Sequence, residues 1–406
     1  MIQTSPAPDL PFSFAALDDR LEQAGVDILI SSSRHNLAYL LGGHRHHFFE
    51  AAEAIGVSRY LPLLVYPKGR PDEAAYIAFR NEKDSLQNRA LEGRALWPAT
   101  VRPAASGVAD AVALAIDHIR AIGGPGGRIG VETHFLPWLA GQALRDAFPA
   151  HGLVDANRPL ERLRAVKSDA ELDRLREASE RVVAAMQAVM RSTRPGTSKR
   201  AIERALRREE EARGLLFDYA LITLGTSLNR APSDQVCRDG DIMSLDSGGN
   251  LDGYIGDLCR MAVFGEADAE LEDLLGEVRT VQDAARKPLA PGVRGGDVFS
   301  FAQAALAALP SAASTTFVAH GMGLVSHEAP RLTAQGPISY PADDADLPLE
   351  AGMILSIETT LQHPRRGFIK IEDTVAITPD GHVGFGDEGR GWTRAGLEAP
   401  PRQAGP

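Results

Sequence analysis

The chain has 406 residues, of which 44% are hydrophobic and 24% charged, as is typical of a globular protein with one to three domains. Its net charge of −11 at pH 7 argues against a nucleic-acid or anionic-membrane partner. The only two cysteines, Cys237 and Cys259, indicate no disulfide framework, so a reducing, cytoplasmic location is expected. The N-terminal residues have no signal-peptide pattern, and no apolar run reaches the roughly 18 residues of a membrane span.

Predicted strands alternate with predicted helices in the first part of the chain, which indicates a small α/β domain over residues 1–166. The loop that follows the first strand contains His44, His46 and His47, for which we expect an exposed histidine cluster. The expected segments, in order, are a helix over 12–24, strands over 26–31, 60–66 and 74–79, a helix over 107–122, a strand over 128–132 and a helix over 137–148.

A second domain is predicted over residues 167–394. Ser168 and Glu171 form a capping box that begins a long helix. Further helices alternate with strands, so we expect an α+β domain in which helices flank an antiparallel sheet. Residues 395–406 are rich in Pro, Gly and Ala, and a disordered tail is expected there. The expected helices of this domain cover 169–191, 199–213, 268–287 and 296–309.

Residues 244–260 have the pattern of a β-hairpin, because apolar and polar residues alternate on both sides of an Asp-Gly turn. Two registers are open: one places Asp246 directly opposite Asp257, and the other makes them diagonal neighbours. Both registers put the two carboxylates on one face, where they repel each other. A cation between them would remove the repulsion, although two solvated Asp residues would give the same pattern.

Three further side chains could converge on that face. His320 ends a short apolar strand in a Gly-rich turn, with His327 seven residues later. Glu358 and Glu372 lie on two strands of a second predicted hairpin, and they face each other if residue 361 pairs with residue 369. Four carboxylates and one imidazole suit manganese, iron, cobalt or zinc, and four negative charges balance two divalent cations.

The order Asp246, Asp257, His320, Glu358, Glu372 resembles the ligand set of the pita-bread metallopeptidases: aminopeptidase P, prolidase, methionine aminopeptidase and the related creatinase. The segment 253–260, Gly-Tyr-Ile-Gly-Asp-Leu-Cys-Arg, is similar to the second-aspartate motif of the aminopeptidase P and prolidase branch. Residues 35–42, His-Asn-Leu-Ala-Tyr-Leu-Leu-Gly, resemble a segment of the creatinase-type N-terminal domain. The resemblance therefore covers nearly the whole chain.

This resemblance implies a creatinase-type N-terminal domain, a pita-bread catalytic domain, and a role for each matching residue. Asp246 would bind one metal ion, His320 and Glu358 the second, and Asp257 and Glu372 both. The resemblance implies hydrolysis of a peptide-like C–N bond by a hydroxide that two divalent ions share. Manganese is the metal expected first, and Xaa-Pro dipeptides or N-terminal Xaa-Pro peptides are the expected substrates. His320, Glu358 and His327 would be catalytic, with His327 near the substrate carbonyl. A homodimer or higher homo-oligomer is also implied.

Three departures from the family pattern concern the substrate side of the site. Asn229 stands near the place of a family histidine, Thr359 replaces a proline, and Lys370 replaces an arginine. An asparagine cannot shuttle a proton at neutral pH. A lysine ammonium is a point charge, whereas an arginine guanidinium can form two parallel hydrogen bonds with one carboxylate. Asn229, His327 and Lys370 are nevertheless the expected substrate-binding residues. The alternatives are a creatinase-like hydrolase or lyase of a small non-peptide metabolite, and a non-catalytic binding protein.

Overall fold

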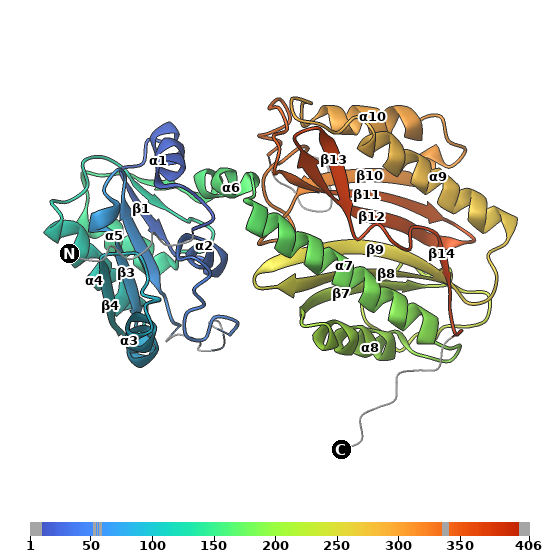
Figure 1. Cartoon of the computed structure of the whole chain (residues 1–406), viewed down its shortest axis with the longest axis horizontal. Helices are drawn as coiled ribbons and strands as arrows, with labels where there is room; N and C mark the ends of the chain where they lie inside the picture. Colours follow the sequence, from blue (N-terminus) through green and yellow to red (C-terminus); the bar gives the residue numbers. More distant parts are fainter. Residues whose placement is uncertain (1–9, 52–53, 55, 57–58, 335–340, 398–406) are drawn as a thin grey trace, which may run out of the picture. The chain divides into compact units, whose positions relative to one another are not determined.

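The computed structural model describes residues 10–51, 54, 56, 59–334 and 341–397. The chain divides between Arg164 and Ala165 into two units, each built around its own sheet (Figure 1). Of the tail expected from residue 395 onward, only residues 395–397 are described, and the backbone N–H of Ala395 donates to the Val263 carbonyl at 2.9 Å. Across the described residues, none of the helices combines the length and the apolar character that crossing a membrane requires.

The first unit is a mixed six-stranded sheet with the order β4-β3-β2-β1-β5-β6. Its apolar strands are buried, and the helix at residues 108–121 packs against them with an alanine- and isoleucine-rich face. The sequence analysis missed five helices and strands of this unit, namely α2, α3, β4, β6 and α6. The strands are β1 (Ile28–Ser31), β2 (Leu63–Pro67), β3 (Ala75–Phe79), β4 (Thr100–Ala105), β5 (Ile129–Val131) and β6 (Leu153–Asp155). The helices are α1 (Phe14–Gln23), α2 (Arg34–Leu40), α3 (Lys83–Leu91), α4 (Val108–Ala121), α5 (Trp138–Ala147) and α6 (Asn157–Ala165).

Most of the segment that resembles the creatinase-type domain forms α2. Its Asn36 side chain donates to the fully buried Glu132 carboxylate at 2.6 Å, which links α2 to the end of β5.

The prediction that His44, His46 and His47 are all exposed is wrong for two of the three. His44 is buried and lies 3.1 Å from Glu82, and His46 is buried too, because the loop folds against Tyr76 of the inner strand β3 and against Glu82, which follows that strand. Only His47 is exposed.

The second unit is an eight-stranded sheet whose main order is β10-β11-β12-β9-β8-β7, with β13 added to β12 and β14 to β9. The two predicted hairpins are β8–β9 and β11–β12, and both are antiparallel. The strands are β7 (Leu216–Leu224), β8 (Ile242–Leu251), β9 (Tyr254–Val263), β10 (Thr315–Gly321), β11 (Ile354–His363), β12 (Gly367–Thr378), β13 (Gly381–Phe385) and β14 (Trp392–Arg394). The helices are α7 (Asp169–Ser192), α8 (Lys199–Ala212), α9 (Ala269–Arg286) and α10 (Asp297–Leu306).

The helices of the second unit determine which face of each hairpin carries polar groups. The amphipathic helices α7 and α8 bury their apolar sides with Leu245 and Leu258 of the first hairpin. Helices α9 and α10 do the same with Leu355 and Ile357 of the second hairpin (Figure 1). Because side chains alternate along a strand, the residues next to these in sequence project from the opposite face. Asp246, Asp257 and Glu358 occupy such positions, and Glu372 follows Ile371, which packs with residues of α9.

Glu210 of α8 carries a buried carboxylate that leads to a prediction about pH. Its Oε1 accepts a hydrogen bond from the Ser247 hydroxyl at 2.7 Å, whereas Oε2 has no hydrogen-bond partner among the described residues. Burial raises the pKa of Glu210 from its ordinary value to about 8. Between about pH 4.5 and 8 the folded protein therefore binds more protons here than the unfolded chain does, and stability falls as the pH rises.

Glu210→Gln removes this titration while keeping the shape of the side chain. We expect the variant to gain about 2–4 kcal/mol of stability relative to the wild type between pH 5 and pH 8. Urea unfolding of both proteins at several pH values measures the difference. Stability curves that stay parallel across this window would show that Glu210 is ionised in the folded protein.

Candidate metal centre

The β8–β9 hairpin adopts the second of the two open registers. Leu251 pairs with Tyr254 across the turn, and Asp257 therefore pairs with Gly248. Asp246 pairs with Cys259, so the two carboxylates are diagonal neighbours on one face. Both side chains are at most 3% exposed.

The β11–β12 hairpin has the register in which its two glutamates meet. Leu361 pairs with Ile369, and Glu358 is directly opposite Glu372. Glu372 also pairs with Cys259 of β9, which joins the two hairpins at the position of their carboxylates. The Ser356 hydroxyl donates to Glu372 Oε1 at 2.8 Å and holds that carboxylate in place.

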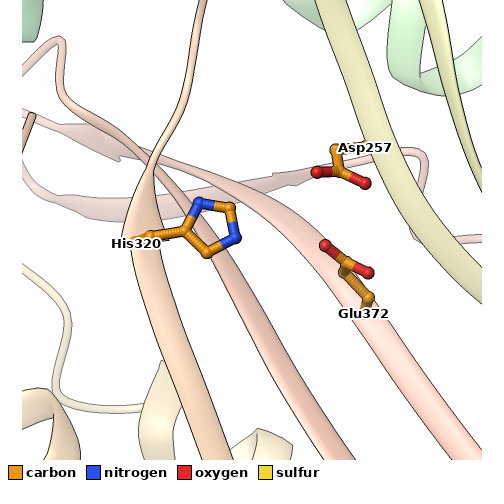
Figure 2. Close-up of side chains that lie close together, drawn as sticks. All are labelled: Asp257, His320 and Glu372. Atoms are coloured by element: carbon orange, nitrogen blue, oxygen red, sulfur yellow. The ribbon is translucent and has the colours of Figure 1, made fainter. Parts of the chain in front are cut away.

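Three buried donors come closest together in this arrangement. Ligand atoms of Asp257, His320 and Glu372 all lie within 4.8 Å of one another. Figure 2 shows the Asp257 and Glu372 carboxylates facing each other, with the His320 ring reaching toward them from β10. The ring also lies beside the second hairpin, since His320 Nε2 is 3.1 Å from Glu358 Oε1. All five predicted ligands thus surround one region of the sheet.

The pKa values of the residues in this region are shifted, because several carboxylates lie close together and are buried from water. Burial, followed by the nearby Glu372 and Asp246, raises the pKa of Asp257 well above its ordinary value. Burial and Glu358 raise the pKa of Glu372 to about 7. Burial alone would lower the pKa of His320, but the hydrogen bond to Glu358 and the negative charges of Glu358 and Glu372 together outweigh burial and raise that pKa. Such shifts mark a site that gains from a bound cation.

Two cationic side chains reach the same carboxylates. Lys370 Nζ lies 2.6 Å from Asp246 Oδ2, 2.6 Å from Glu358 Oε2 and 2.7 Å from Glu372 Oε2. Arg230 forms an ion pair with Asp246. Burial would raise the pKa of Glu358, but Lys370 and His320 outweigh burial and hold that pKa well below its usual range. The sequence analysis assigned Lys370 to substrate binding and missed Arg230, although Arg230 directly follows the Asn229 that it singled out.

Tyr219 of β7 is a second residue that the sequence analysis missed. This half-buried side chain hydrogen-bonds to the Asp257 carboxylate. Gly248 makes the contact sterically feasible, because a Cβ at this position would lie 2.3 Å from the Tyr219 ring. The paired glycines in the 244–249 segment were a signal of such a close approach.

His327 lies against the centre through its ring. The His320 and His327 rings stack at 3.7 Å between centroids with an interplanar angle of 23°. Burial, and then the neighbouring His320, lower the pKa of His327 to about 3. Its ring is therefore neutral at pH 7 and offers one N–H donor and one acceptor nitrogen.

Asn229 and Thr359 face other partners. Asn229 is exposed, and its side-chain oxygen accepts from the backbone N–H of Ala231 at 3.0 Å, which shapes the loop before β8. Thr359 is fully buried on the opposite face of β11 from Glu358, and its hydroxyl donates to Gln282 at 2.8 Å. Of the three departures from the family pattern, Lys370 alone contacts the proposed ligands directly.

The donor set fits a divalent metal ion. It combines hard carboxylate oxygens with one imidazole nitrogen, and its members are fully or almost fully buried. The mutual repulsion that raises the pKa of Asp257 and Glu372 would be relieved by a cation between them.

Comparison with known proteins identifies the family. Residues 173–379 match metallopeptidase family M24, and residues 14–166 match the creatinase/prolidase N-terminal domain. The chain belongs to metallopeptidase family M24. The predicted fold class, a creatinase-type α/β domain followed by a pita-bread α+β domain, is confirmed, and so is the prediction of a metal-dependent peptidase. Membership of this family implies divalent metal ions.

Individual relatives are similar over most of their length. The chain is 31% identical to the probable dipeptidase PepE of Mycobacterium tuberculosis over 260 residues, which are 62% of this chain and 66% of the relative. It is 27% identical to the Xaa-Pro dipeptidase of Lactobacillus delbrueckii over 265 residues, 63% of this chain and 69% of the relative. The crystal structure of dipeptidase PepE from Mycobacterium ulcerans has a TM-score of 0.73 at 26% identity, covering 94% of this chain and 97% of that one.

Proposed function

We propose that this metallopeptidase hydrolyses the peptide bond before proline in Xaa-Pro dipeptides or in peptides that begin with Xaa-Pro. The observation that carries the proposal is the convergence of Asp257, His320 and Glu372, with ligand atoms within 4.8 Å of one another, beside Asp246 and Glu358. The relative from Lactobacillus delbrueckii, named an Xaa-Pro dipeptidase, supports this substrate class.

Each of the five side chains would bind one or both of two metal ions. Asp246 would bind one ion, His320 and Glu358 a second, and Asp257 and Glu372 would bind both, with manganese as the expected metal. Divalent ions held in this way supply a nucleophilic water near neutral pH and polarise the scissile carbonyl. The dimeric or higher homo-oligomeric state and the cytoplasmic location remain predictions.

The surrounding residues of this chain would orient the substrate and move protons. His327 is neutral, so its ring N–H can donate to the substrate carbonyl oxygen, which gains negative charge as the bond is attacked. Glu358 would orient the attacking water by accepting a hydrogen bond from it, because its low pKa keeps this carboxylate ionised. Tyr219 fixes the Asp257 carboxylate by its hydrogen bond.

Purified protein supplied with Mn²⁺, Co²⁺ or Zn²⁺ tests the substrate class. We expect release of proline from Xaa-Pro dipeptides, little release of alanine from matched Xaa-Ala dipeptides, and loss of the activity in chelator. A tripeptide series Xaa-Pro-Yaa distinguishes a dipeptidase from an aminopeptidase. Failure to cleave any Xaa-Pro peptide with any of the three metals would overturn the proposal.

A further inference from the structure

Lys370 holds an unusual position for a side chain next to metal ligands. Its ammonium nitrogen is surrounded by one carboxylate oxygen each of Asp246, Glu358 and Glu372, at 2.6, 2.6 and 2.7 Å. The side chain is 4% exposed. Carboxylate oxygens would surround a bound metal ion at this place in the same way.

The position of Lys370 on β12 directs its side chain toward the three carboxylates. Lys370 lies two residues before Glu372 on β12, and side chains two apart on a strand project from the same face. Thr360, its partner across the hairpin, is two residues after Glu358. The ammonium therefore reaches the carboxylates from within the ligand-bearing face, and no loop has to move to bring it there.

The ligand set consequently falls into two groups. Asp257, His320 and Glu372 bring their ligand atoms within 4.8 Å of one another. Asp246, Glu358 and Glu372 surround Lys370. Glu372 alone belongs to both groups. An ion can join the first group without displacing Lys370, whereas an ion that binds Asp246 and Glu372 together must compete with the ammonium.

The charges lead to the same division. The four carboxylates carry four negative charges, and Lys370 and Arg230, both ion-paired to Asp246, supply two positive ones. One divalent ion then completes neutrality, with His320 neutral as a ligand. Two divalent ions would neutralise the carboxylates on their own and would leave the buried Lys370 ammonium without compensation, which is costly in a site removed from water.

We propose that Lys370 is a resident cation that takes the place of the second metal ion. The centre holds one divalent ion tightly at Asp257, His320 and Glu372, and a second ion binds only when Lys370 leaves its carboxylates. The inference rests on the ligand set of the proposed function, but it replaces the two tightly bound ions expected there by one, and it is independent of the substrate.

Metal titration of the whole protein tests this. After dialysis in buffer with micromolar Mn²⁺, we expect elemental analysis to find one ion per chain, and calorimetry to find a second ion bound at least about 100-fold more weakly. Lys370→Met removes the charge but keeps an unbranched apolar side chain, and we expect two ions per chain in that variant. Lys287→Met makes the same change at an exposed position of the same unit and is expected to stay at one ion.

A wild-type measurement keeps the test independent of how well the variant folds. Protein with two equivalents of Mn²⁺ should show the electron paramagnetic resonance spectrum of isolated ions and not of a spin-coupled pair. Two ions of similar affinity in the wild type, a spin-coupled pair at two equivalents, or a folded Lys370→Met variant that still binds one ion would overturn the inference. A protein that shows the expected metal counts but cleaves no Xaa-Pro peptide would overturn the proposed substrate alone.

Discussion

His320→Ala is expected to lower kcat/KM for Xaa-Pro dipeptides on the order of 10³-fold and to reduce the bound metal. His320 is fully buried, and it supplies the one nitrogen donor of the three closest ligands. Changes to residues that merely support metal ligands typically cost about 10–100-fold, and loss of a ligand itself should cost more. Its ring also contacts Glu358 at 3.1 Å and stacks on His327, so the substitution disturbs the residue proposed to orient the water and the residue proposed to donate to the substrate carbonyl.

His363→Ala is the matched control, because His363 ends β11 in the same unit and its ring serves the hairpin turn by accepting from the Arg366 backbone at 3.1 Å. Steady-state kinetics and elemental analysis of both variants, at equal Mn²⁺, give the comparison. We expect the control to keep its metal content and to stay within about threefold of wild-type kcat/KM. If His320→Ala kept full metal content and activity, the assignment of the centre would be wrong.

Local pattern was enough to predict the paired carboxylates. Side-chain alternation puts Asp246 and Asp257 on one face in either register, and the turn over residues 364–366 fixes Glu358 opposite Glu372. The start of one helix was also predictable, because Ser168 and Glu171 form a capping box there. These features depend on residues that are neighbours in sequence, so a single chain reveals them.

Contacts between distant segments were not predictable. Arg230 reaches Asp246 only because the loop before β8 folds against the start of β12, and Tyr219 reaches Asp257 only because β7 pairs with β8 beside Gly248. For Lys370, the pattern gave the correct face of β12 but could not tell whether the ammonium would turn to the substrate or to the carboxylates. Burial of His44 likewise depends on Glu82, which lies 38 residues away along the chain.

The choice between two ions and one depends on these distant contacts. Counting carboxylates alone balances two divalent cations, as the sequence suggests. Adding Lys370 and Arg230, each in contact with Asp246, changes the balance to one. A family ligand set can therefore be complete in sequence while its neighbours alter how many ions it favours.

Arg260→Met is expected to destabilise the second unit by about 3–5 kcal/mol, the usual cost of breaking a fully buried ion pair. The Arg260 guanidinium is fully buried and forms an ion pair with the fully buried Asp373 at 3.1 Å. It also donates to the backbone carbonyls of Glu372 at 2.7 Å and Gly386 at 2.6 Å. Methionine fills part of the volume but donates no hydrogen bond, so these carbonyls would lose their partner in a place that water cannot reach.

Arg390→Met is the control for this prediction. Arg390 also contacts Asp373, at 3.1 Å, but its side chain is 18% exposed and water can replace part of what it provides, so we expect a loss of about 1–2 kcal/mol. Chemical denaturation followed by circular dichroism measures both losses. Because Arg260 holds the backbone at Glu372, Arg260→Met should also weaken Mn²⁺ binding in protein that is still folded, whereas Arg390→Met should leave it within about threefold of the wild type. Equal stability losses in the two variants would show that Arg260 contributes no more to stability than Arg390 does, and that its complete burial does not give it the role assigned here.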